Sequence, residues 1–560
     1  MSKKIVIVGG VAGGASAAAR LRRLDETANI ILFEREEHVS FANCGLPYYI
    51  GDVIEEREKL LVQTVDGMSK RFNLDIRNFS EVTRIHRDRQ TISVTNVQTK
   101  ETYEESYDVL ILSPGAQPIV PPIPGIDEAK NIFTLRNIPD TDQIKAFIHQ
   151  HQPEKAAVIG GGFIGLEMAE NLVEKGLKVT LIEMQNQVMA PLDYEMAAIV
   201  HNHLREKGVQ LILEDGVTSF ADQGEVIVLS SGEKVKTDMT LMSIGVKPEN
   251  KLALDAGLNV GERGGIQVND FLQTNDESIY AIGDVIEVKD YVSEQPAMIP
   301  LAGPANHQGR IVANNIYGKK ERYKGTLGTS VAKVFDLTVA TTGNNEKLLK
   351  QQRKAYDVLH IHPTSHAGYY PNAHPIALKV IFSKATGEIF GAQAVGMDGV
   401  DKRIDVIATA ILGKLTVYQL ADLELAYAPP YSSAKDPVNM AGYVAENMKE
   451  NRVETVQWHE IDQLVHDGGV LIDVRGPNGF ATGSIPGSIN IPLNDIRDRM
   501  NEIPKDKTIY VTCRSGIDAY IATRILKENG YKAKNVDGAW LTYEAVLKDT
   551  GSNRVLSSKQ

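Results

Sequence analysis

The sequence predicts an α/β protein of several domains. Its 560 residues are about four times the commonest domain size, which indicates three to four folding units. Twice along the chain, at residues 4–23 and 156–175, a strand-like apolar run leads into a glycine-rich turn and then into a helical pattern. This order is typical of doubly wound parallel sheets, so two Rossmann-like nucleotide-binding domains are predicted.

The composition excludes several other classes of protein. Hydrophobic residues make up 42% of the chain and charged residues 24%, values that argue against disorder, collagen-like repetition and a coiled-coil rod. The net charge of −12 disfavours a general polyanion binder, so we expect no nucleic-acid partner. A local basic pocket for one phosphorylated ligand is still compatible with this charge.

The sequence predicts a cytoplasmic protein without a membrane span. No apolar run approaches the roughly 18–20 residues needed to cross a bilayer, and the apolar start Ile5–Val8 ends at two glycines, too soon for a signal peptide. The two cysteines, Cys44 and Cys513, lie in what we predict to be different domains. We therefore expect no structural disulfide and a reducing compartment.

The second glycine turn carries a complete dinucleotide-binding pattern. Gly160, Gly162 and Gly165 follow a strand and open a helix, and glycines at this spacing permit a tight turn, close approach of a pyrophosphate and close helix packing. Glu183 ends the next strand, where a carboxylate binds ribose hydroxyls and repels a 2′-phosphate. These four residues predict a site for NADH rather than NADPH.

The first glycine turn is less regular. Val11 stands where the pattern has its second glycine, so a merely structural turn is the alternative interpretation. Glu34, at the end of the following strand, restores the ribose contact. The predicted cofactor-binding residues of this turn are Gly9, Gly10, Ala12, Gly13, Gly14 and Glu34.

Two later segments resemble motifs of a known family. The segments Leu112–Ala116 and Ile279–Asp284 resemble the late motifs of flavoproteins with two dinucleotide sites. Their predicted cofactor-binding residues are Ser113, Pro114, Gly115, Gly283 and Asp284. From residue 3 to about residue 448 the chain resembles the pyridine nucleotide-disulfide oxidoreductases. The resemblance implies FAD in the first domain, with Asp284 against the ribityl hydroxyls, NADH in the second, and a dimerisation domain that makes the protein a homodimer.

Cys44 is the predicted redox residue. The segment Ser40–Tyr48 resembles the single-cysteine branch of this family, which contains coenzyme A disulfide reductases, NADH oxidases and NADH peroxidases. The oxygen- and peroxide-reducing members place a catalytic histidine where this chain has Ala12, so a sulfur substrate is favoured. The resemblance implies a Cys44 thiolate that is stabilised by the flavin and nearby dipoles and attacks a disulfide sulfur. A small buried hydrophobic residue is the alternative.

Two tyrosines are predicted to act with this cysteine. Tyr427, together with Tyr369 or its neighbour Tyr370, resembles the tyrosine pair of coenzyme A disulfide reductases. In those enzymes the pair reaches the cysteine of the other subunit, which implies an active site shared between the subunits of a homodimer. Packing in the core or in an interface is the alternative role for these rings.

A substrate with coenzyme A's phosphates needs cations. Arg20, Arg22 and Arg23 follow the first turn on one helix, and Arg71 lies further on, although such charges are often a solvated helix face. The predicted substrate-binding set is Ser40, Asn43, Arg22, Arg23 and Arg71.

Four histidines gather in the third domain and raise the question of a metal. They are His360, His362, His366 and His374. No acidic residue or cysteine completes a ligand set in this segment, so no metal site is predicted.

The last α/β pattern centres on Cys513. A strand at 508–512 runs into this cysteine and a helix follows from 519 to 528, so backbone N–H groups are expected to surround the sulfur, lower its pKa and hold a persulfide. Cysteine phosphatases have an arginine six positions after the cysteine, where this chain has Ala519. The segment resembles a rhodanese sulfurtransferase domain. Asp518 and Ser484 depart from that pattern and put thiosulfate in doubt as a donor, and an inactive docking domain is the alternative.

The predicted fold is therefore two Rossmann-like domains, an α+β dimerisation domain and an α/β rhodanese domain. The expected bounds are 1–115 and 246–322 for the FAD-binding domain, 116–245 for the NADH-binding domain with its linker, 323–448 for dimerisation and 453–560 for the rhodanese. The whole pattern resembles coenzyme A disulfide reductases fused to a rhodanese, which implies NADH-driven reduction of coenzyme A disulfide or persulfide. The alternatives are a persulfide or polysulfide reductase with little disulfide activity, and a disulfide reductase with a passive last domain.

Overall fold

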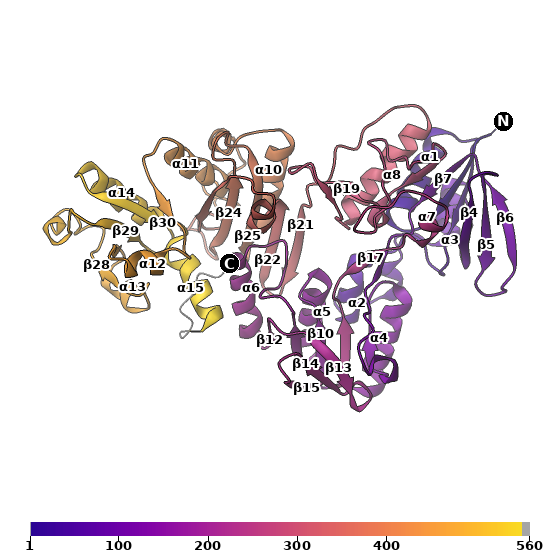
Figure 1. Ribbon diagram of the computed structural model, residues 1–560, viewed down its shortest axis with the longest axis horizontal. Helices are drawn as coiled ribbons and strands as arrows, with labels where there is room; N and C mark the ends of the chain where they lie inside the picture. Colours follow the sequence, from indigo (N-terminus) through magenta and orange to yellow (C-terminus); the bar gives the residue numbers. More distant parts are fainter. Residues whose placement is uncertain (1, 552–560) are drawn as a thin grey trace. The chain divides into compact units, whose positions relative to one another are not determined.

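The computed structural model describes residues 2–551, and the chain divides into two compact units (Figure 1). The first unit comprises the residues up to 185 and residues 212–328, and the second comprises 186–211 and the chain from 329 onward. The architecture is α/β, as predicted. No helix among residues 2–551 is both long and apolar enough to span a bilayer.

The first nucleotide-binding domain is built on a five-stranded parallel sheet. Its order is β18 (Ile279–Ala281), β7 (Val109–Leu112), β1 (Lys4–Val8), β2 (Asn29–Phe33) and β3 (Asp75–Arg77). The central strands read as continuous Ile, Val and Leu runs because helices cover both faces of a parallel sheet. The helices are α1 (Ala12–Leu24), α2 (Leu46–Ile50), α3 (Val65–Phe72), α7 (Lys251–Asp255) and α8 (Ala302–Ile316), and an antiparallel sheet consists of β4 (Ser80–His86), β5 (Thr91–Asn96) and β6 (Thr102–Ser106).

The second nucleotide-binding domain repeats this plan. Its parallel sheet has the order β12 (Gln210–Ile212), β11 (Lys178–Ile182), β10 (Lys155–Ile159), β16 (Met239–Met242) and β9 (Ile132–Phe133), with α4 (Ile138–His151) and α5 (Phe163–Glu174). An antiparallel sheet follows, made of β13 (Val217–Ala221), β14 (Val226–Leu229) and β15 (Lys234–Lys236). The linker between the two domains, which is rich in proline from Pro114 to Pro124, contains β8 (Ala116–Pro118), and this strand pairs with β17 (Val246–Pro248).

The second unit contains a five-stranded antiparallel sheet. Its order is β21 (Ser330–Val334), β22 (Leu337–Gly343), β25 (Ile389–Gly396), β24 (Ile376–Phe382) and β23 (Asp357–Ile361). Both β24 and β25 are buried along their whole length. The helices α6 (Tyr194–Glu206), α9 (Glu346–Gln351), α10 (Val400–Leu412) and α11 (Pro437–Lys449) belong to the same unit.

The unit ends in a parallel sheet of order β26 (Thr455–Val456), β30 (Lys532–Val536), β29 (Thr508–Thr512), β27 (Val470–Asp473) and β28 (Ser488–Asn490). Its helices are α12 (Ile461–His466), α13 (Pro477–Ala481), α14 (Ile517–Glu528) and α15 (Ala539–Thr550), and α15 packs against α6 (Figure 1).

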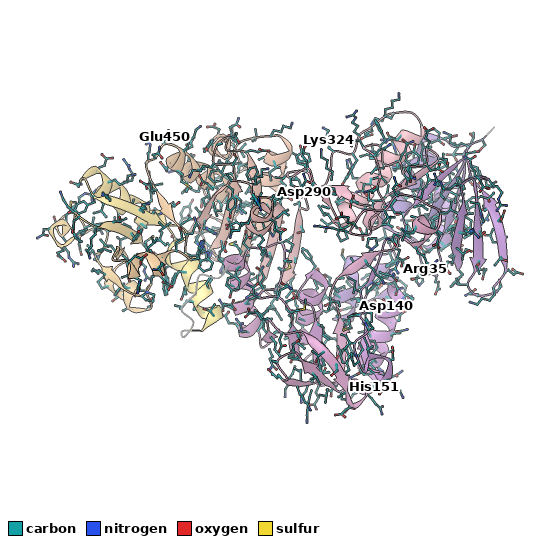
Figure 2. The ribbon with its side chains drawn as sticks, viewed as in Figure 1. Arg35, Asp140, His151, Asp290, Lys324 and Glu450 are labelled. Carbon is teal, nitrogen blue, oxygen red and sulfur yellow. The ribbon has the colours of Figure 1, made fainter. Side chains whose placement is uncertain are left out.

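The polar linker before this last domain begins at Glu450, which Figure 2 labels at the end of α11. Side chains of α14 hold it in place. The Arg524 guanidinium donates to the Arg452 carbonyl at 2.8 Å, and the Lys527 ammonium donates to the Asn451 carbonyl at 3.1 Å. The linker is therefore a fixed connection in this unit.

Candidate active sites

The first glycine turn is a close contact between two backbone segments. Gly9 has φ +97°, and a Cβ at this position would lie 2.1 Å from the Ser113 carbonyl oxygen. A Cβ at Gly14 would lie 1.9 Å from the Gly9 carbonyl oxygen. Only glycine fits both positions, and the resulting turn leaves the N-terminus of α1 open to an anion.

The second glycine turn has the same construction. Gly160 has φ +106°, and a Cβ here would lie 2.4 Å from the Ser243 carbonyl oxygen. A Cβ at Gly165 would lie 1.9 Å from the Gly160 carbonyl oxygen. Gly162 differs, because no atom lies within 4 Å of its would-be Cβ. No contact with the rest of the protein therefore requires glycine at position 162. The free space beside its backbone can accommodate a pyrophosphate.

Both predicted ribose carboxylates are fixed in the same way. Glu34 accepts hydrogen bonds from the backbone N–H groups of Gly10, at 2.9 Å, and Glu36, at 3.2 Å. Glu183 accepts from Gly161 and Gln185, each at 2.8 Å. Each carboxylate thus stands at the end of its strand beside the glycine turn, where a bound dinucleotide presents its ribose.

The segments around Ser113 and Asp284 lie beside the first glycine turn, and their side chains fit FAD. A Cβ at Gly13 would lie 2.9 Å from the Ser113 hydroxyl oxygen, and the Gly283 N–H donates to the Gln308 side chain at 2.7 Å. Among residues 2–551, no group forms a hydrogen bond or ion pair with the Asp284 carboxylate, and burial raises its pKa. A polyol hydroxyl would supply the missing donor.

Cys44 lies in a short 3₁₀ turn, Asn43–Gly45, just before α2, and its side chain is exposed. Partial desolvation by the surrounding protein raises the pKa of its thiol, and the carboxylates of Glu167 and Asp284 act in the same direction. Stabilisation of the Cys44 thiolate by the flavin and nearby dipoles stays a prediction.

Glu167 is a residue that sequence reasoning missed. It lies on α5, two positions after Gly165. Its place just after the last glycine of the second turn is the feature of the sequence that could have pointed to it. Burial raises its pKa to about 7, with a contribution from Glu170. The carboxyl group therefore changes protonation near neutral pH within the electrostatic range of Cys44.

A basic cavity of about 420 Å³ opens beside the first turn. Four guanidinium groups line it, those of Arg20, Arg23, Arg71 and Arg310. Among residues 2–551, no carboxylate lies within ion-pair distance of any of these four groups. Ser40 also lines the cavity, whereas Asn43 donates to the Arg136 carbonyl at 3.3 Å instead. Arg310 and its neighbour Asn306 come from α8, far along the chain, which is why the sequence did not indicate them.

The predicted role of Arg22 in substrate binding is wrong. This side chain is 5% exposed and donates to the backbone carbonyls of Phe72, Asp25, Glu26 and Asn73. On α1 it faces the protein interior, while its neighbour Arg23 faces the cavity. The guanidinium of Arg22 therefore ties α1 to the end of α3.

In the second unit, Tyr369 and Tyr427 come together with their hydroxyl oxygens 2.8 Å apart. This hydrogen bond raises the pKa of Tyr369, and both rings are exposed. Tyr370 packs edge-on against His366 instead. Tyr427 also lines a second cavity of about 540 Å³ with Lys402 and Tyr431.

Cys513 lies between β29 and α14 and is 1% exposed. The Gly516 N–H donates to its sulfur at 3.1 Å, so the expected nest of backbone donors is present. Burial nevertheless raises the pKa of the thiol, since it outweighs the N–H groups of Ala519, Gly516 and Ser515, and the Asp518 carboxylate adds to the rise. The predicted lowering of this pKa is wrong, because a buried sulfur loses more hydration than the nest restores.

Comparison with known proteins identifies the class. Residues 3–309 match the pyridine nucleotide-disulphide oxidoreductase family, 329–437 match the dimerisation domain of that family, and 457–545 match the rhodanese-like domain. The chain belongs to the pyridine nucleotide-disulphide oxidoreductase family and is an FAD-dependent oxidoreductase with a C-terminal rhodanese domain, which confirms the resemblance found in the sequence.

Three relatives are similar to this chain over most of its length. A coenzyme A disulfide reductase of Staphylococcus haemolyticus is 40% identical over 80% of this chain and 100% of its own. A crystal structure of reduced Bacillus anthracis CoADR-RHD is 63% identical with a TM-score of 0.97, covering 98% of this chain and 99% of that one. An NAD-dependent persulfide reductase from A. fulgidus is 38% identical with a TM-score of 0.91, covering 96% and 100%.

The different surroundings of two glycines in the second turn give a testable prediction. Gly165→Ala places a methyl group against the Gly160 carbonyl, so the free energy of unfolding should fall by about 1–3 kcal/mol. Gly162→Ala meets no protein atom and should leave stability unchanged, yet weaken NADH binding by about tenfold or more because its methyl occupies the ligand's space. Thermal unfolding and an NADH titration of both variants measure the two effects. Unchanged NADH affinity in Gly162→Ala would contradict the site.

Proposed function

We propose that this protein uses NADH to reduce coenzyme A disulfide and coenzyme A persulfide, with Cys44 as its redox cysteine. The observation that carries the proposal is the cavity lined by Ser40, four residues before Cys44, and by four guanidiniums that have no carboxylate within ion-pair distance among residues 2–551. Coenzyme A carries a 3′-phosphate and a pyrophosphate, and arginine forks suit such groups. The relatives named for coenzyme A disulfide and for persulfide reduction support the same substrate class.

The nucleotide preference follows from Glu183. Its carboxylate, held by the Gly161 and Gln185 N–H groups, accepts hydrogen bonds from ribose hydroxyls and opposes a 2′-phosphate. We therefore assign NADH, bound by Gly160, Gly162 and Gly165, as the electron donor.

Residues of the first domain would hold the flavin. The pyrophosphate belongs at the Gly9–Gly14 turn and the N-terminus of α1, the ribose at Glu34, and the ribityl chain at Asp284. FAD, when bound, supplies the two-electron chemistry that connects NADH to the Cys44 sulfur.

Cys44 performs the exchange with the substrate. Its thiolate attacks one sulfur of the disulfide, forming a Cys44–coenzyme A mixed disulfide and releasing the other coenzyme A as a thiolate. With a persulfide, Cys44 takes the outer sulfur and coenzyme A leaves as the thiolate. In both cases two electrons from NADH would return Cys44 to the thiolate and release the bound group, as coenzyme A from the mixed disulfide or as sulfide from the persulfide. The leaving thiolate needs a proton, and we assign this role to Tyr427, whose hydroxyl is hydrogen-bonded to that of Tyr369. The pair would act on Cys44 of the partner subunit in a homodimer.

Cys513 is proposed to carry sulfane sulfur for this reaction. The Gly516 N–H and its neighbours form a cradle for an anionic persulfide, while the Asp518 carboxylate disfavours a dianionic donor such as thiosulfate. Both cysteines are free, which suits the reducing cytoplasm that we assign to the protein.

Steady-state rates with three substrates test this function. With NADH as donor, we expect turnover of coenzyme A disulfide, coenzyme A persulfide and polysulfide, and Cys44→Ser should abolish all three. Cys513→Ser should spare the disulfide and lower the flux from polysulfide. If Cys513→Ser matches the parent with every donor, the last domain is a passive module. If the parent reduces persulfide but not the disulfide, the protein is a persulfide reductase.

The arginine cavity gives a second test. Arg310→Met should raise KM for coenzyme A disulfide by about 10–100-fold, the effect of losing one charge-assisted hydrogen bond, with little change in kcat. Pantethine, which lacks the nucleotide phosphates, should be reduced equally well by variant and parent. Arg322→Met removes an exposed arginine of the same unit and serves as the matched control. Equal KM values for coenzyme A disulfide in parent and Arg310→Met would contradict the assignment.

The tyrosine pair gives a third test. Tyr427→Phe should slow turnover by about 10–1,000-fold because it removes a proton donor, while Tyr431→Phe, on the same loop, should not. Mixing Cys44→Ser subunits with Tyr427→Phe subunits tests sharing, since a mixed dimer has one intact site only if the two residues come from different chains. Activity that does not rise above the level of the Tyr427→Phe protein after mixing would show that each subunit works alone.

A further inference from the structure

A buried row of charged side chains crosses the second unit. The His360 ring lies between two carboxylates, with Nδ1 2.7 Å from Asp537 Oδ2 and Nε2 3.0 Å from Glu195 Oε1. Glu195 also contacts the ammonium of Lys379. All four side chains belong to residues that are at most 4% exposed. Burial at this level makes each contact strong and makes the loss of any partner costly.

Three distant segments supply this row. His360 and Lys379 lie on the neighbouring strands β23 and β24, Glu195 lies on α6, and Asp537 lies between β30 and α15 in the rhodanese domain. Lys379 lies among the carboxylates of Asp193, Glu195 and Glu346, so an ammonium group occupies the centre of this acidic cluster. Both acids that contact the His360 ring come from segments far away in the sequence, so only folding brings them to it.

The geometry determines the protonation of His360. Carboxylate oxygens are acceptors, so a ring with a carboxylate at each nitrogen must donate from both and carries a positive charge. Burial by itself would lower the pKa, but the charges and hydrogen bonds of Asp537 and Glu195 outweigh it and raise the pKa of His360 to about 9. The other groups that face the ring are Lys379, whose pKa is raised well above its usual value, and His362, whose pKa burial lowers to about 3.

Asp537 connects this row to the loop at Cys513–Gly516, between β29 and α14. Its carboxylate also accepts from the His360 backbone N–H at 3.0 Å and from the Gln457 side chain at 3.1 Å. Two residues later α15 begins, and N–H groups of its first turn bind that loop: Trp540 donates to the Cys513 carbonyl at 3.0 Å and Leu541 donates to the Arg514 carbonyl at 3.1 Å. The position of Asp537 therefore sets the position of the backbone on which the Cys513 sulfur stands.

We infer that the His360 imidazolium is a positioning residue for sulfur transfer at Cys513, because it clamps Asp537, and with it the start of α15, against the dimerisation domain. The inference rests on the proposed role of Cys513 as a sulfur carrier. The far end of α15 has its own anchor, Asp549, which contacts His201, Arg205 and Tyr194 of α6. Loss of His360 therefore loosens the start of α15 while the domain stays attached.

The test compares His360→Gln with His362→Gln. His362 is the matched control because it lies two residues away on β23 and contacts α15 through the Thr542 hydroxyl at 2.8 Å, but faces no carboxylate. We expect His360→Gln to raise the amide exchange rate of residues 538–541 by about 10–100-fold, the scale of a lost charge-assisted hydrogen bond, and to slow persulfide loading of Cys513 by polysulfide by about tenfold. NADH-linked reduction of coenzyme A disulfide should not change. His362→Gln should leave the amide exchange of residues 538–541 and the persulfide loading of Cys513 within about threefold of the parent, since the hydrogen bond of His362 to Thr542 involves no charged group.

A pH series on the parent protein gives a second measurement that needs no variant. The folded pKa lies above the ordinary value of 6.5, so the clamp is complete below about pH 6.5 and is lost as pH rises through about 9. Exchange at residues 538–541, relative to amides of α10 in the same sample, should rise about tenfold between pH 7.5 and pH 10. His360→Gln should show no such step.

Each outcome decides the inference. Unchanged exchange or unchanged persulfide loading in His360→Gln overturns it. If that variant does not fold, a flat pH series in the parent overturns it instead, and a step near pH 9 supports it. A parent protein that takes up no persulfide at Cys513 contradicts the proposed function, and the role of His360 falls with it, whereas normal loading in His360→Gln contradicts the inference alone.

Discussion

The backbone contact at each glycine turn is the constraint on which the nucleotide-binding half depends. Gly9 passes so close to the Ser113 carbonyl, and Gly160 to the Ser243 carbonyl, that no side chain fits between them. The contact fixes where α1 and α5 begin, and thus where their N-termini face an anion. It also places the N–H groups that hold Glu34 and Glu183. Two cofactor sites follow from one repeated piece of backbone geometry.

The second unit is held together differently. Its two domains meet through buried charges, including the pairs of His360 with Asp537 and His201 with Asp549. Apolar contacts alone tolerate small shifts, whereas buried ions are costly unless the partner is in place. Such an interface favours one defined position of the start of α15 over small shifts.

The two cysteines differ in exposure but share one electrostatic property. Cys44 is exposed and Cys513 is buried, yet the protein raises the pKa of both thiols. In each case carboxylates add to desolvation: Glu167 and Asp284 at Cys44, and Asp518 at Cys513. At both positions, therefore, the surrounding protein favours the neutral thiol over the thiolate.

The sequence by itself determined the α/β class and the two glycine turns, and it singled out the two strand-end carboxylates and the two cysteines. These features follow local rules, since a turn needs glycine at given positions and a strand end carries its acid a fixed distance on. Tertiary structure decided the rest. It turned Arg22 inward while Arg23 lines the cavity, brought Arg310 to that cavity, selected Tyr369 over Tyr370 as the partner of Tyr427, and gave His360 its two acids. The physical reason is that burial and charge pairing depend on segments far apart in the chain, whose meeting no local pattern records.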